Sequence, residues 1–246
     1  MVDSTKLTIG QLNEAIAGPA HKDLAYSTDQ DAVSRWRNLA CSMVEGADFW
    51  WWLRNPTVSA ITLVADTYAY SLAADFSRLD GASLYYANSP TARLVCVEDP
   101  AVMDRELGPV GFDDGGSPSM CAVVGDKLWT RLKPNATFVA DNPTLYYLYF
   151  RTILPTYLWE AAKTAANDAT ETRAPTWTLP YLVSASMAFS LQEEDDNAFQ
   201  AKVRDWYAND LVQMRTFTQS PSSYEPPLPP LIRQRSRRGW RGSGRY

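Results

Sequence analysis

The sequence predicts an α+β fold: N- and C-terminal helices form one bundle, an antiparallel β-domain is inserted between them, and an extended C-terminal tail follows. Apolar residues recur at three- and four-residue steps near both ends, which is typical of amphipathic helices. Between them lie short β-type runs broken by turn residues. We therefore predict N-terminal helices over 1–57, the β-domain over 58–152, C-terminal helices over 153–219 and the tail over 220–246.

The first helix is predicted from a local capping signal. Thr8 followed by Gln11 forms a capping box, and Gly18-Pro19 ends the helix. Its apolar face comprises Ile9, Leu12 and Ile16. A longer helix is expected to begin near Thr28, where the Thr hydroxyl and Asp31 take up free amide groups. Its apolar stripe comprises Val33, Trp36, Ala40, Met43 (or Val44) and Ala47.

This longer helix is expected to run through three consecutive tryptophans, Trp50, Trp51 and Trp52, and to end at Asn55-Pro56. Neighbouring positions of a helix point about 100° apart, so the three side chains cannot all face one core. We expect two of them to pack inside and the third to meet the β-domain or another subunit, since tryptophan is enriched in buried protein contacts. All three are therefore candidate subunit-interface aromatics.

The middle region is predicted to be antiparallel. Residues 60–64 and 68–72 flank 65–67 as a hairpin. Gly125-Asp126 is a tight-turn signal between two later strands. The further strands expected cover 82–87, 93–97, 120–124, 127–132 and 145–153.

Two helices are predicted in the C-terminal part of the body. Leu179, Leu182, Ser186 and Phe189 mark one of them. The other has the stripe Phe199, Val203, Trp206, Asp210, Met214 and Phe217. The acidic run 193–196 lies between them, at the positive start of the second helix.

Catalytic chemistry has little support in the residues. The three cysteines are widely spaced without a CxxC, so we expect reduced thiols and neither a disulfide framework nor a metal site. The single histidine, His21, leaves Cys41 as its one conceivable nucleophilic partner, and no flanking motif supports that pair. We expect no catalytic residue, no metal and no cofactor. No run approaches the roughly 18 apolar residues of a membrane span, and the start resembles no secretory signal, so we expect no membrane association.

Charge is distributed unevenly along the chain. The net charge is −5, but residues 233–246 contain six arginines and no acid, so 17 basic and 28 acidic residues leave −11 on the rest. Pro226–Pro230 predicts a stiff polyproline spacer before this end. The arginines and aromatics suit either phosphates and bases or an acidic protein groove, and a solubilising tail is the third alternative. The candidate docking residues are Leu231, Ile232, Arg233, Arg235, Arg237, Arg238, Trp240, Arg241, Arg245 and Tyr246.

The order of these segments resembles the head-to-tail adaptor proteins of tailed bacteriophages (connector or neck proteins, tail tubular A-like). The resemblance spans roughly residues 7–217. It rests on the aromatic run 49–53, on the segment 61–76 with its T-x-x-Y-x-L hairpin motif, and on Gly116-Ser117-Pro118. Ala73-Ala74 stand where the family tends to have proline.

The resemblance implies a structural protein of the virion neck, assembled in the host cytoplasm. Such adaptors form rings, usually twelvefold, beneath the portal protein, extend the DNA channel and present a platform to the tail or nozzle. Their C-terminal extensions dock on the portal. An acidic body disfavours phosphate capture, so double-stranded DNA would pass through the lumen without specific binding.

Two other functions stay open from the sequence. In the first, the arginine tail makes the chain a nucleic-acid-binding accessory protein. In the second, the chain is a virion-associated cell-wall hydrolase, which would need two carboxylates at glycosidase separation. The sequence offers many acids but singles out no such pair.

Overall fold

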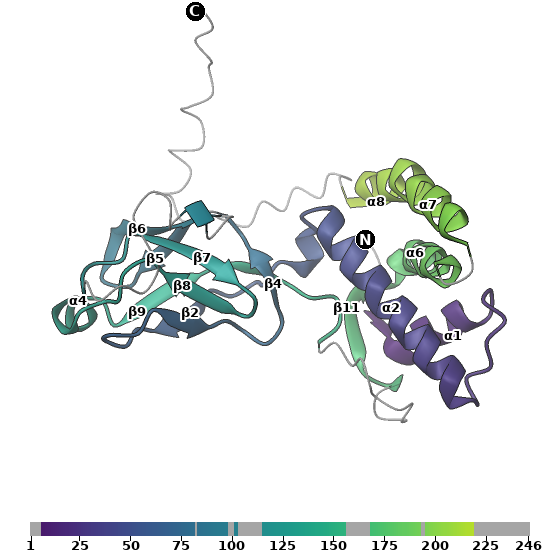
Figure 1. The fold of residues 1–246 in the computed structure, drawn as a ribbon, viewed down its shortest axis with the longest axis horizontal. Helices are drawn as coiled ribbons and strands as arrows, with labels where there is room; N and C mark the ends of the chain where they lie inside the picture. Colours follow the sequence, from purple (N-terminus) through teal and green to yellow (C-terminus); the bar gives the residue numbers. More distant parts are fainter. Residues whose placement is uncertain are drawn as a thin grey trace, which may run out of the picture.

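The chain is an α+β protein in which a helical part and a sheet part lie side by side (Figure 1). The computed structural model describes residues 6–81, 83–97, 101–102, 115–155, 168–192 and 195–218. The predicted tail, and with it every candidate docking residue from Leu231 to Tyr246, lies outside these residues.

Segments from both ends of the chain build the helical part. Helix α2 packs against α6, and α1 packs against both. Strand β1 (Lys6–Thr8) pairs antiparallel with β11 (Glu171–Pro175) beside them. The helical elements are α1 (Ile9–Ala17), α2 (Ser27–Ala47), η1 (Trp51–Leu53), η2 (Thr176–Thr178), α6 (Leu179–Leu191), α7 (Asp196–Asp205), η3 (Trp206–Asp210) and α8 (Leu211–Thr218).

The predicted capping box of the first helix is confirmed. The Gln11 amide donates to the Thr8 hydroxyl over 3.2 Å, and the Thr8 amide donates to the Gln11 side chain over 3.0 Å. The predicted face of α1 is buried in the helical core, with Leu12 and Ile16 fully inaccessible. A two-residue signal therefore predicted both the start and the orientation of this helix.

Both ends of the second helix differ from the prediction. Helix α2 starts at Ser27, and its N-cap Tyr26 makes no side-chain cap, so capping by Thr28 and Asp31 was wrong. It ends at Ala47 instead of continuing through the tryptophans, because Asp48 adopts an extended conformation. The indole of Trp50 folds back and donates to the Val44 carbonyl over 2.6 Å, which satisfies one of the acceptors that a helix end leaves free.

The second C-terminal helix is one continuous rod of three stretches. Asp195 caps α7 by accepting from the amides of Asn197 and Ala198. The π-helical turn η3 then joins α7 to α8 and carries Trp206, which is fully buried and donates from Nε1 to the Tyr181 carbonyl over 3.0 Å. Phe217, predicted to lie on the apolar face, is instead 61% exposed. The extra residue of the π turn changes the phase of the helix face.

The sheet part is a nearly closed seven-stranded sheet with the order β2-β9-β5-β6-β7-β8-β3. Its core is separate from that of the helices and contains Leu84, Leu94, Leu128 and Leu145 together with several tyrosines. The strands are β2 (Ser59–Thr62), β3 (Ala69–Ser71), β5 (Ser83–Tyr86), β6 (Ser89–Val97), β7 (Met120–Val124), β8 (Lys127–Thr130) and β9 (Thr144–Tyr147).

The hairpin predicted over 60–72 was wrong. Its two strands form the opposite edges of the sheet, β2 pairing with β9 and β3 with β8. The intervening chain crosses between these edges: Leu63 donates to the Pro143 carbonyl over 2.9 Å and Asp66 to the Pro134 carbonyl over 3.0 Å. A longer-range pairing thus replaces the local turn, and this segment spans the opening of the sheet.

The sheet is also not wholly antiparallel, as predicted, because β6 and β7 run parallel. Parallel neighbours need a crossover of a dozen or more residues, and the chain from 98 to 119 provides that length. The turn at Gly125-Asp126 does join β7 to β8 as predicted, with Gly125 at φ 63°. The short helix α4 (Ala136–Asp141), capped by Asn135, was not predicted.

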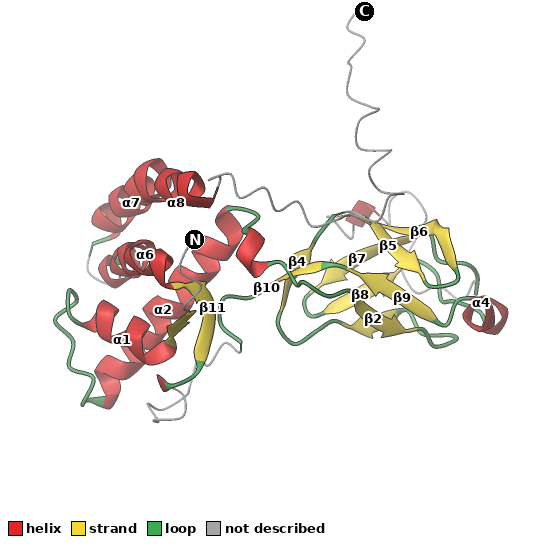
Figure 2. Cartoon of the chain, turned by 180° about the vertical axis from the view of Figure 1, so that it is seen from behind, coloured by secondary structure: helices red, strands yellow, loops and turns green. Residues whose placement is uncertain are grey.

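A two-stranded ribbon joins the two parts. Strand β4 (Phe76–Leu79) pairs antiparallel with β10 (Tyr149–Arg151), and both lie between the helices and the sheet in Figure 2. The strand predicted over 145–153 is thereby divided into β9 and β10. Tyr149 contributes to the core of the sheet, whereas Phe150 contributes to the helical core. One short strand therefore anchors both parts.

Candidate assembly interface

The tryptophan triplet lies where the helical part meets the ribbon. Trp50 and Trp52 are 1% and 8% exposed and stack at 6.2 Å between ring centroids, whereas Trp51 is 59% exposed. The 3₁₀ turn η1 separates their directions, because its three-residue period sends adjacent side chains about 120° apart. Two tryptophans thus pack inside and one faces outward, as predicted. The subunit contact of Trp51 stays a prediction.

Phe49, which the sequence analysis did not single out, is 64% exposed two residues before Trp51. Its ring meets Phe150 edge to face at 5.4 Å, and the Arg78 guanidinium lies 4.0 Å from its centroid. Burial lowers the pKa of Arg78, although Asp48 and Glu45 oppose that shift. A guanidinium held against an aromatic face fixes the orientation of Phe49 while leaving its outer face free.

The end of α8 lies beside the end of α2. Arg215 Nε donates to Asp48 Oδ2 and Arg215 Nη2 to the Ala47 carbonyl over 3.3 Å. Phe217 follows on the same helix and stacks on Trp177 at 5.9 Å, yet remains 61% exposed. The chain after Thr218 thus starts next to the segment that carries Phe49 and Trp51. We call Phe49, Trp51 and Phe217 the junction aromatics.

Ion pairs hold this junction in a defined geometry. Arg54, next to η1, pairs with Asp80 at the end of β4. Asp75, just before β4, accepts from Arg173 Nη2 over 2.9 Å and from the Tyr149 hydroxyl over 2.7 Å. Burial and the bond to the Asp75 carboxylate raise the pKa of Tyr149 to about 12. The buried Glu45 carboxylate also accepts from the Ile153 amide. These bonds connect α2, β4, β10 and β11.

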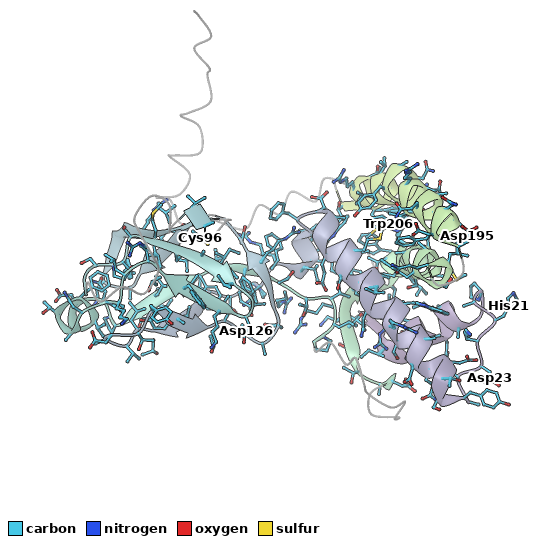
Figure 3. The ribbon with its side chains drawn as sticks, in the orientation of Figure 1. His21, Asp23, Cys96, Asp126, Asp195 and Trp206 are labelled. Carbon is cyan, nitrogen blue, oxygen red and sulfur yellow. The ribbon has the colours of Figure 1, made fainter. Side chains whose placement is uncertain are left out.

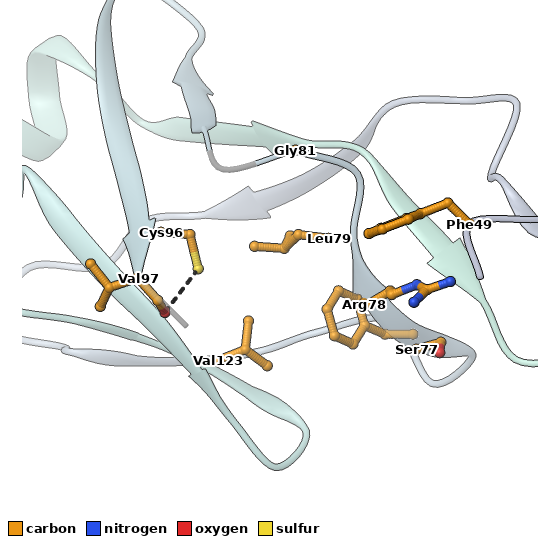
Figure 4. A pocket seen from close by; sticks show the side chains of 9 residues that line it. Phe49, Ser77, Arg78, Leu79, Gly81, Cys96, Val97 and Val123 are labelled. Carbon is orange, nitrogen blue, oxygen red and sulfur yellow. Dashed lines mark hydrogen bonds between the residues drawn. The ribbon is translucent and has the colours of Figure 1, made fainter. Parts of the chain in front are cut away.

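A pocket of about 460 Å³ opens beside the junction at one end of the sheet (Figure 4). Its wall is mainly apolar, with Arg78 as a cation at one side and Cys96 facing the cavity from β6. The Arg78 Nε–H is buried and lacks a hydrogen-bond partner among the described residues. The other lining residues are Phe49, Phe76, Ser77, Leu79, Gly81, Val97 and Val123.

The conceivable Cys41–His21 pair has no structural support. Cys41 is fully buried in the helical core, and burial raises the pKa of its thiol. His21 lies in the exposed loop after α1, at the outer end of the helical part (Figure 3). The described part of the chain contains no group of three or more His, Cys, Asp or Glu side chains placed to hold a metal ion. None of its helices is long and apolar enough to cross a membrane.

No protein-family model matches the chain, and no curated protein shows significant similarity to it. The candidate site is therefore defined by the junction alone. Sequence reasoning found Trp51 through the triplet but missed Phe49, Arg78 and Phe217. Phe49 offered a signal, since it directly precedes the triplet, whereas the exposure of Phe217 depends on the π turn.

Proposed function

We propose that this chain is a structural, non-enzymatic virion protein: a head-to-tail adaptor that assembles as a ring beneath the portal of a tailed bacteriophage. The observation that carries the proposal is the exposure of the three junction aromatics, each 59–64% accessible, on segments that ion pairs hold together. Aromatic residues are enriched in subunit interfaces, and gathered exposed apolar groups mark interaction sites.

In this proposal the N- and C-terminal helices form the bundle that makes the ring wall, and the inserted β-domain faces the tail or nozzle. A closed ring uses heterologous contacts, so the junction aromatics of one copy would meet a different face of the next. The charge of −11 outside the arginine tail supports a lumen through which double-stranded DNA slides without being captured.

The C-terminal tail would clamp the portal in the same assembly. It follows α8, whose end is fixed to α2 by Arg215, so its anchor point would be the junction itself. Its arginines suit carboxylates, and Trp240 suits a buried anchor position. A tail that orders only on docking couples its folding to assembly.

The ring is tested by native mass spectrometry and electron microscopy of the full chain, alone and mixed with portal. We expect rings on portal, and we expect Trp51→Ser to weaken them at least tenfold in midpoint concentration. Tyr26→Ser is the matched control, because Tyr26 is 64% exposed at the start of α2, outside the junction. A chain that stays monomeric with every virion component would overturn the proposal.

The tail is tested separately by deleting residues 226–246. We expect the truncated chain to lose portal docking while keeping its fold by circular dichroism. Binding to duplex DNA is measured in parallel at low and high salt. DNA affinity that falls steeply with salt and vanishes on truncation would favour the nucleic-acid-binding alternative instead.

A further inference from the structure

Two of the three cysteines face each other across neighbouring strands. In the parallel pair β6–β7, Cys96 lies directly opposite Cys121, and their side chains are close enough to interact by hydrogen bonding. Both are free thiols. Paired strands lie about 4.8 Å apart. A disulfide needs about 4.4–6.8 Å between Cα atoms. The register therefore brings the two residues within bonding range.

The two thiols differ in access. Cys121 is fully buried, whereas Cys96 is partly buried and lines the pocket beside the junction (Figure 4). The hydrogen bond from Cys121 lowers the pKa of Cys96, and the same bond raises the pKa of Cys121. Because the thiolate is the nucleophile, a reagent in the pocket would meet the more reactive sulfur first.

The pocket also has a feature that selects its reagent. Arg78 lines the same cavity, and its buried Nε–H has no hydrogen-bond partner among the described residues. Arginine pairs well with carboxylates. The remaining wall is apolar and the volume of about 460 Å³ admits a small organic molecule. A small disulfide that carries a carboxylate fits this combination.

We propose that Cys96 and Cys121 form a thiol–disulfide exchange site for small carboxylate-bearing disulfides. The Cys96 thiolate attacks the external disulfide, forms a mixed disulfide and releases one small thiol, which takes up the proton that Cys96 lost. Cys121 then gives up its proton and attacks the Cys96 sulfur. The Cys96–Cys121 bond forms, and the second small thiol leaves with that proton. Two electrons pass from the protein dithiol to the reagent.

The inference does not depend on the proposed function. The crosslink would tie β6 to β7, the pair joined by the long crossover rather than by a tight turn. The thiols stay reduced in a cytosol and become oxidised outside the cell, so the bond would report the compartment of the protein. The sequence analysis expected reduced thiols, which is the starting state of this exchange.

The test uses the folded full chain treated with oxidised glutathione. We expect intact-mass analysis to show the loss of two hydrogens, peptide mapping to show Cys96 joined to Cys121, and free thiols to fall from three to one. Cys41→Ser is the matched control and should form the same bond, leaving no free thiol. A wild-type chain that retains three free thiols while folded, or that crosslinks Cys41, would overturn the proposal.

Single variants separate the two steps. Cys121→Ser should stop at one glutathione on Cys96, and Cys96→Ser should give neither product. Arg78→Met should slow the first step severalfold with oxidised glutathione, but not with cystamine, a disulfide that lacks carboxylates. Equal slowing with both reagents would exclude carboxylate recognition by Arg78. Glutathione on Cys121 in Cys96→Ser would exclude the assigned order of attack.

Discussion

The two parts of the molecule bury aromatic residues in different ways. In the helical part the buried tryptophans donate to carbonyls of helices: Trp50 to Val44 and Trp206 to Tyr181. In the sheet part the buried tyrosines bond to the segments around the strands, as Tyr70 does with the Thr67 carbonyl and Tyr86 with the Pro118 carbonyl. Each aromatic group thus fills a core and fixes the end of an element.

This difference gives the two parts different sensitivities. A tryptophan carries no titratable group, so the helical core responds to changes of volume. The buried tyrosines of the sheet carry hydroxyls whose pKa burial raises, so the sheet responds to alkaline pH as well. The ribbon β4–β10 and its ion pairs belong to both parts and link their responses.

The largest expected effect comes from emptying the helical core. Trp206→Ala removes a fully buried ring and leaves a cavity, so we expect a loss of about 3–5 kcal/mol in the free energy of unfolding. Urea denaturation followed by circular dichroism measures it. The neighbouring Tyr207, 47% exposed, supplies the control: Tyr207→Ala should change stability by about 0.5 kcal/mol or less. Similar losses for both would contradict the assigned core.

The joint comes next in size. Asp75→Asn weakens the bonds to Arg173 and Tyr149 together, and we expect a loss of about 1–3 kcal/mol because both partners are largely buried. Glu171→Gln is the control, since the Lys6–Glu171 pair is exposed and worth at most about 1 kcal/mol. Denaturant midpoints of the two variants compare them directly. A smaller loss at Asp75 than at Glu171 would show that the ribbon does not couple the parts.

Alkaline pH should destabilise the sheet. The pKa of Tyr149 is raised to about 12 in the folded state from an ordinary value of about 10, so its contribution is complete below pH 10 and disappears as the pH rises toward 12. We expect the urea midpoint to fall over this range. The fall should be smaller in Tyr149→Phe. Tyr146→Phe, at an exposed position of the neighbouring strand, should keep the wild-type slope.

The smallest effects test the same substitution in both parts. Gly46 lies in α2 with open space around its Cα, so Gly46→Ala should stabilise the chain by about 0.5–1 kcal/mol. Gly125 has φ 63° in the β7–β8 turn, so Gly125→Ala should destabilise it by about 1 kcal/mol. Thermal denaturation measures both. Shifts of equal sign would disprove the backbone argument.

The sequence alone determined the features that depend on a few adjacent residues. The Thr8–Gln11 box, the Gly125-Asp126 turn and the acidic start of α7 each place both partners within four positions, and all three lie where expected. The strands over 83–86 and 120–124 follow from β-type runs of the same short range. At the junction, the triplet rule of two tryptophans inside and one outside also came from adjacent residues.

The tertiary structure decided which segments meet. The edges β2 and β3 lie close in sequence, yet each gains more by pairing with a distant strand, because the closed core needs partners on both sides. Likewise, β10 is separated from β9 because its side chains serve two cores at once. The exposure of Phe217 and the pocket at Arg78 depend on such long-range packing. Patterns within one segment carry no information about it, since register and contact are properties of two segments together.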